Sequence, residues 1–191
     1  MDDGPQRIVL VGMMGAGKTS VGTAVADRLG WPMLDNDGLV RAATGRDGPT
    51  IFRDDGEEAL HAAERAAFVA GIDRPPPAVV TVAGSVIDDP QLVARLPATG
   101  WVVWLRARPE TLRERIDRGV GRRADATDAA WLAARNRDRS ERYERVADQV
   151  VDVDDRSVES IADEIVRATR SRPTGTDRPA DRGGAGSRRL S

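Results

Sequence analysis

A short glycine-rich stretch holds the residues whose chemistry is most specific. Residues 12–19 read GMMGAGKT, which places Gly12, Gly17, Lys18 and Thr19 at the spacing of a phosphate-binding loop. Glycines let the backbone curl so that successive N–H groups face a phosphate, and the start of a following helix adds partial positive charge. The lysine would reach the outer phosphates of a nucleoside triphosphate, and the threonine hydroxyl would bind Mg²⁺.

Lys18 is the chain's one lysine among 29 lysine and arginine residues. A compact ammonium on a flexible stem suits a crowded loop better than a planar guanidinium does. No second lysine exists for the base-reading motif of a GTPase, and the chain is too short for a large motor ATPase, so a small kinase remains. We expect ATP to contact Gly12, Gly15, Ala16, Gly17, Lys18, Thr19 and Ser20.

The composition limits the other possibilities. A chain of 191 residues with 40% hydrophobic residues suits one domain with its own core. A formal charge of −2 gives no reason to expect nucleic acid or an anionic membrane as partner. There are no cysteines and one histidine, which excludes thiol chemistry and an all-histidine metal cluster. Without a membrane-length apolar run or a signal peptide, we expect a cytoplasmic monomer acting on a small molecule.

Apolar runs alternate with helical periodicity along residues 1–170, which predicts a three-layer α/β/α fold with a central parallel sheet of about five strands. Strands are expected at 7–11, 32–34, 78–82, 101–105 and 150–153. Helices are expected at 18–29, 56–71 with Gly71 as its stop, 90–96, from Pro109 through Ile116, 128–147 and 157–170. Residues 117–127 break the periodicity and are expected to be mobile, and residues 171–191 form a predicted disordered tail.

Several blocks together give the chain a resemblance to a known family. They are the phosphate loop, Asp35-x-Asp37, Thr44-Gly45-Arg46 and Ile51-Phe52-x3-Gly56-Glu57-x6-Glu64. From about residue 7 to 170 the chain resembles shikimate kinase, a P-loop kinase that phosphorylates shikimate with ATP and Mg²⁺. The phosphate loop is generic, whereas the later blocks make the resemblance fairly specific.

The resemblance implies roles for two carboxylates in a substrate-binding region at about 35–62. Thr19 and Asp35 would bind Mg²⁺, the aspartate through water. Asp37 would contact the acceptor hydroxyl and could orient it or accept its proton. The alternative is that this pair caps a helix, since aspartate is favoured at such positions and a helical stretch follows.

Four arginines also take roles from the resemblance. Arg122 or Arg123, within a lid at about 117–127, would close over the transferred phosphoryl group, although paired arginines in a loose loop can also be merely solvated. Arg139 would bind the substrate carboxylate with its bidentate fork, against the alternative of an arginine on a solvated helix face. Arg115 and Arg156 would flank the adenine.

Departures from the family pattern lie on the acceptor side. His61 stands where the family has a second carboxylate-binding arginine, which could cost roughly 1.5–3 kcal/mol of binding. Ala83-Gly84-Ser85 replaces three glycines, and Gly84 is expected to keep the close approach of backbone to substrate. The alternatives left open are a kinase of another polyol or sugar acid, such as a gluconate kinase, and a nucleotide-binding module without activity.

Overall fold

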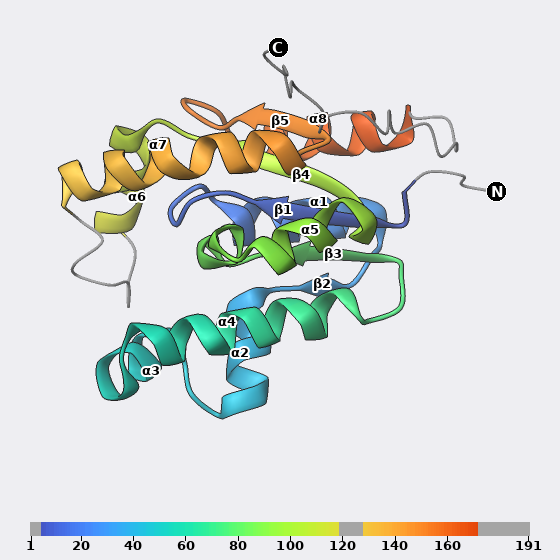
Figure 1. Cartoon of the computed structure of the whole chain (residues 1–191). Coiled ribbons are helices and arrows are strands. Elements are labelled where there is room, and N and C mark those ends of the chain that lie inside the picture. The colour runs from blue at the N-terminus through green and yellow to red at the C-terminus, as the bar shows by residue number, and fades with distance from the viewer. Residues whose placement is uncertain (1–4, 119–127, 172–191) are drawn as a thin grey trace, which may run out of the picture.

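The structure is a computed structural model that describes residues 5–118 and 128–171. Its centre is a parallel sheet in the order β2-β3-β1-β4-β5 (Figure 1). The strands are β1 (Arg7–Val11), β2 (Met33–Leu34), β3 (Ala78–Thr81), β4 (Trp101–Arg106) and β5 (Gln149–Asp152). Leu10 of β1 lies opposite Thr81 on one side and Val103 on the other. The predicted five-stranded parallel sheet is confirmed.

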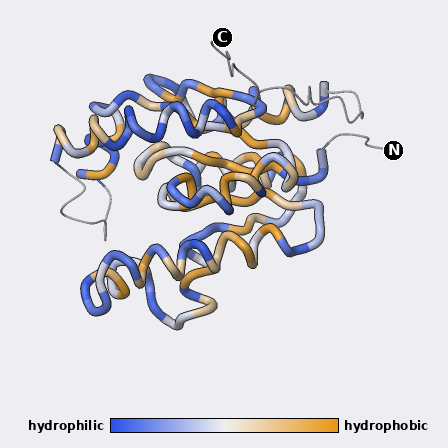
Figure 2. Tube along the Cα trace, in the orientation of Figure 1, coloured by the Kyte–Doolittle hydropathy of each residue, from blue (hydrophilic) through white to orange (hydrophobic). Residues whose placement is uncertain are grey.

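Helices cover both faces of this sheet. They are α1 (Lys18–Leu29), α2 (Asn36–Thr44), α3 (Gly48–Asp55), α4 (Glu57–Ile72), α5 (Pro90–Thr99), α6 (Pro109–Asp117), α7 (Ala129–Val146) and α8 (Val158–Arg170), with a 3₁₀ helix η1 (Gly84–Asp88). Helix α1 packs against α8, whereas α5 and α7 contact each other and β4. The result is the expected three-layer α/β/α arrangement, in which the central strands carry the most hydrophobic segments (Figure 2).

The strands are buried because helices lie on both sides of them. Ile8, Val9 and Leu10 are completely buried, as are Val79 and Val80 of the neighbouring β3. Continuous apolar runs of this kind are typical of parallel strands covered on both faces. None of the described helices is long and apolar enough to cross a membrane.

Helices α2, α3 and α4 form a smaller unit beside β2 (Figure 1). Val40, Ile51, Leu60 and Ala67 supply its separate apolar core. This unit carries the predicted substrate-binding region, so its packing fixes where the acceptor side of the site lies relative to the sheet.

Helices α3 and η1 are additional to the predicted elements, and α4 ends one residue beyond its predicted end. Helix α3 was not predicted, although Asp47 caps it by accepting a 2.9 Å hydrogen bond from the Thr50 N–H. Gly71 does not stop α4, which continues to Ile72. A Cβ at Gly71 would lie 3.1 Å from Leu39 and 3.3 Å from Val80, so this glycine instead lets α4 approach α2 and β3 closely.

Candidate active site

The loop between β1 and α1 has the predicted strand before it and the predicted helix after it. Gly12 and Gly15 have positive φ values of 146° and 84°, which side chains rarely tolerate. Added Cβ atoms there would lie 2.7 Å from the Leu105 carbonyl oxygen and 2.8 Å from that of Leu112. Backbone angle and space therefore both require glycine, and the loop is seated on β4 and α6.

Lys18 begins α1 and its side chain turns back over the loop. Its Nζ donates to the carbonyl oxygens of Gly12 at 2.9 Å and Met13 at 3.0 Å. Buried Ala16 donates its N–H to the same Met13 carbonyl, while Ser20 is exposed in the first turn of α1. The ammonium thus lies at the centre of the loop, where a phosphate held by the backbone N–H groups would meet it.

Asp35 joins the phosphate loop to the sheet. Its Oδ1 accepts hydrogen bonds from Thr19 Oγ1 at 3.0 Å and from Thr81 Oγ1 at 2.8 Å. Asp35 occupies the N-cap position of α2, but its side chain makes no capping hydrogen bond. The capping alternative is therefore wrong for this side chain, which crosses to α1 and β3 instead.

The Thr19 and Asp35 oxygens fit a hard cation that takes most of its ligands from phosphates and water, as Mg²⁺ does. Among the described residues, no group of three or more histidine, aspartate or glutamate side chains forms a complete metal cage. Sequence reasoning missed Thr81, which orients the same carboxylate. Thr81 could have been found from the sequence, because it is a polar residue at the carboxyl end of an otherwise apolar strand.

Asp37 lies exposed in the first turn of α2, where its negative charge is favourable to the helix dipole. It is also close enough to Glu64 of α4 for its charge to raise the pKa of that carboxyl. The structure thus brings the second predicted carboxylate to the side of the site formed by α4.

Glu64 is the main acceptor-side residue to which sequence reasoning gave no role. It accepts a hydrogen bond from the Ser85 hydroxyl, which joins α4 to η1. Burial raises the pKa of the Glu64 carboxyl, while the Ser85 hydrogen bond and the charges of His61 and Lys18 act in the opposite direction. The charge of Lys18, in the phosphate loop, is thus among those that act on the Glu64 carboxyl. The sequence signal for Glu64 was its position as the last residue of the block Ile51-Phe52-x3-Gly56-Glu57-x6-Glu64.

This burial predicts how stability depends on pH. A carboxyl with a raised pKa in the folded state binds protons more readily there, so its contribution to stability is lost as the pH rises through that pKa. We expect the free energy of unfolding of the wild type to fall relative to Glu64→Gln as the pH rises above the ordinary pKa range of a glutamate carboxyl. Urea unfolding at several pH values measures it, and a difference independent of pH would contradict the assignment.

Arg139 is buried beside the phosphate loop. Its side chain is 7% exposed, and its Nη1 lies 3.7 Å from Met13 Sδ. Gly84 is packed against it, since a Cβ there would lie 3.0 Å from the same nitrogen. The solvated-face alternative is wrong for Arg139, whereas its neighbour Arg137 is exposed. Arg139 is paired with Asp88, which sequence reasoning did not single out.

His61 faces an open cleft of about 530 Å³, large enough for a small ligand. The cleft is lined by His61, Arg65, Ser85, Asp88, Asp89, Pro90 and Gln91. The His61 side chain is 19% exposed, and its Nε2 lies 3.6 Å from Glu57 Oε1 on the preceding turn of α4. The histidine is therefore part of a cleft wall that also includes one residue of the Ala83-Gly84-Ser85 segment.

The two arginines predicted to flank the adenine, Arg115 and Arg156, have different partners. Arg115 donates to the Ala16 carbonyl at 3.4 Å and to the Val153 carbonyl at 2.9 Å, which ties the phosphate loop to the segment after β5. Arg156 pairs with Glu164 at 2.8 Å and so is held against α8. Contact of either arginine with adenine stays a prediction. Arg122 and Arg123 lie outside the described residues, as do most of the predicted lid and tail.

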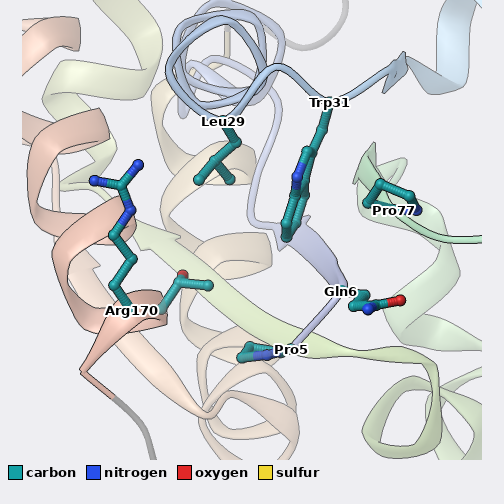
Figure 3. Close-up of a pocket in the computed structure, with 7 residues that line it drawn as sticks. Pro5, Gln6, Leu29, Trp31, Pro77 and Arg170 are labelled. Atoms are coloured by element: carbon teal, nitrogen blue, oxygen red, sulfur yellow. The ribbon is translucent and has the colours of Figure 1, made fainter. Parts of the chain in front are cut away.

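A second hollow, shown in Figure 3, lies at the end of the strands opposite the phosphate loop. It is lined by Pro5, Gln6, Leu29, Trp31, Pro77, Thr169 and Arg170. Pro5, Gln6 and Pro77 precede β1 and β3, so this hollow lies at the amino ends of the strands, whereas open α/β sheets bind ligands at the carboxyl ends. At about 130 Å³ it is also smaller than the roughly 300–1,000 Å³ of ordinary ligand sites.

Known proteins share this arrangement over most of the chain. The family model described as shikimate kinase matches residues 14–170. A shikimate kinase from Caldanaerobacter subterraneus subsp. tengcongensis is 34% identical over 164 residues, 85% of this chain and 95% of that protein. One from Symbiobacterium thermophilum is 36% identical over 170 residues, 87% and 97% of the two chains. The solved structure of shikimate kinase from Acinetobacter baumannii in complex with shikimate has a TM-score of 0.76 at 28% identity, covering 85% and 92%.

Proposed function

The chain belongs to the shikimate kinase family, and we propose that it transfers the γ-phosphoryl group of ATP to shikimate, giving shikimate 3-phosphate and ADP. One observation of geometry carries the proposal. A phosphate-binding loop and a buried arginine meet at Met13, whose carbonyl oxygen accepts from Lys18 and whose sulfur lies 3.7 Å from Arg139. Nucleotide phosphates and an anionic acceptor would therefore be held side by side.

On the nucleotide side, the loop N–H groups and Lys18 bind the phosphate oxygens. The Lys18 ammonium exchanges its two carbonyl acceptors for the β and γ oxygens, where charge develops during transfer. Thr19 and Asp35 would hold Mg²⁺, which neutralises phosphate charge when bound. The lid arginine, Arg122 or Arg123, would add positive charge over the same oxygens and help exclude water.

On the acceptor side, Asp37 orients the attacking hydroxyl and accepts its proton. A bond forms between the hydroxyl oxygen and the γ-phosphorus as the bond from that phosphorus to the β–γ bridging oxygen breaks, which leaves ADP. Arg139, with Gly84 packed against it, binds the substrate carboxylate, and His61 faces the cleft that Asp88, the partner of Arg139, also lines. We propose that the protein acts as a monomer.

A coupled assay of ADP release with an acceptor panel tests the proposal. Shikimate, quinate, gluconate and uncharged cyclitols are compared at equal concentrations with ATP and Mg²⁺, and shikimate is expected to give the highest kcat/KM. Preference for gluconate would favour the gluconate kinase alternative. Tight ATP binding without turnover of any acceptor would favour a module that has lost activity.

Replacing His61 with arginine is expected to lower KM for shikimate about tenfold, because a charged fork adds a charge-assisted contact to the carboxylate. Ala62→Arg is the matched control, since it adds the same charge at the next, exposed position of α4. Steady-state kinetics with shikimate as the varied substrate measures the effect. An unchanged or higher KM for His61→Arg would count against shikimate as acceptor.

A further inference from the structure

Asp88, the last residue of η1, is surrounded by three arginines of α7. Arg139 reaches it through Nε at 3.2 Å and Nη2 at 2.5 Å, and Arg142 through Nη1 at 2.8 Å. Arg135 lies 3.4 Å away on the preceding turn of the helix. Burial acts to raise the pKa of the Asp88 carboxyl, but the hydrogen bond and charge of Arg139, with the charges of the other two arginines, outweigh it and lower that pKa. Asp88 is thus a firmly ionised partner of this cluster.

The neighbouring carboxylate shows that Asp88 is not simply part of a helix cap. Asp89 accepts hydrogen bonds from the backbone N–H groups of Gln91 at 2.9 Å and Leu92 at 3.2 Å, and so fixes the start of α5. Asp88 instead points to the arginines from the wall of the cleft that contains His61. Its side chain is 31% exposed, whereas that of Arg139 is 7% exposed.

The pairing has an electrostatic reason. A guanidinium as buried as Arg139 is costly without an anion beside it, and Asp88 supplies that anion from the protein itself. Asp88 accepts hydrogen bonds from both Nε and Nη2 of Arg139, and this is the bidentate arrangement in which arginine binds a carboxylate. A substrate carboxylate arriving at the same edge would therefore meet a like charge.

We propose that Asp88 is a resident counter-ion of Arg139 which the carboxylate of the acceptor displaces, so that Asp88 sets the affinity for acidic acceptors. This inference rests on the proposed function, in which Arg139 binds that carboxylate. Arg142 and Arg135 already contact Asp88 from more exposed positions, with side chains 38% and 32% exposed. Asp88 can move outward onto them and remain paired while Arg139 turns to the substrate. The exchange keeps every charge compensated but makes acceptor binding a competition.

The test compares KM for shikimate and for its neutral methyl ester in the wild type and in Asp88→Asn. The amide keeps the shape of the side chain and removes the competing charge, so KM for shikimate is expected to fall about tenfold while KM for the ester stays unchanged. Asp138→Asn is the matched control, because the Asp138 carboxylate also pairs with Arg142, at 3.2 Å, whereas the ion pair of Arg139 in the described part of the chain is with Asp88. An unchanged or higher KM for shikimate, or an equal change for the ester, would overturn the inference.

A second variant keeps the test decisive if Asp88→Asn folds poorly. Arg142→Gln removes one of the exposed arginines onto which Asp88 would move, so Asp88 competes more strongly with the substrate for Arg139 and KM for shikimate is expected to rise severalfold. The control is Arg137→Gln, which removes an equal charge from the exposed side of α7. Equal KM values for these two variants would overturn the inference. Turnover of shikimate by the wild type tests the proposed function separately, since the enzyme can use shikimate whether or not Asp88 competes.

Discussion

Replacing Lys18 with alanine is expected to lower kcat for phosphoryl transfer at least about 10³-fold, because the phosphoryl group loses the fixed cation that stabilises its negative charge during transfer. The ammonium lies where Gly12 and Met13 carbonyls already hold it, so little reorganisation is needed when phosphate oxygens replace them. Single-turnover ADP formation with saturating ATP and acceptor measures the loss.

The variant Lys18→Arg tests whether the positive charge alone is sufficient. Arginine keeps the charge, but a planar guanidinium does not fit a point 2.9 Å and 3.0 Å from two loop carbonyl oxygens. We therefore expect it to restore little of the rate. Urea unfolding of both variants verifies that the fold is intact. Near-normal turnover by Lys18→Ala would refute the phosphate-loop role.

The parts of the fold that the sequence predicted well are those set by local pattern. The run from Ile8 to Val11 has no polar side chain, and short runs of this kind before a glycine turn are typical of strands covered on both faces. Helix α3 and η1 were missed because each is short and depends on its surroundings. The eight residues of α3 contribute Ile51 to a core completed by Val40 of α2 and Leu60 of α4.

The roles of Asp35 and Asp37 were implied by the family resemblance and stay predictions. From residue spacing alone, the site was predictable at the phosphate loop, which lies between β1 and α1. It was not predictable where partners lie far apart along the chain. The Ser85 hydroxyl meets Glu64 from 21 residues away, and Arg139 meets Asp88 from 51 residues away. No periodicity in a single sequence encodes such pairs, because η1 is positioned by its packing against α4, α5 and α7.

Replacing Asp37 with asparagine is expected to lower kcat about 10²- to 10⁴-fold, the range for loss of a positioned proton acceptor. The amide has nearly the same shape and can still contact the hydroxyl, so the loss reports the missing base and charge. Rapid-quench measurement of shikimate 3-phosphate with saturating substrates isolates this step from changes in binding.

Asp37 also stands in the first turn of α2, so its structural effect must be separated from its chemical one. Loss of a charge at a helix start costs about 0.3–1 kcal/mol of stability. Glu159→Gln is the matched control, because Glu159 is exposed in the first turn of α8, outside the cleft. Similar small losses of unfolding free energy in both variants, with a large loss of kcat in Asp37→Asn alone, would identify Asp37 as the proton acceptor. A kcat for Asp37→Asn within about tenfold of the wild type would leave it a positioning residue.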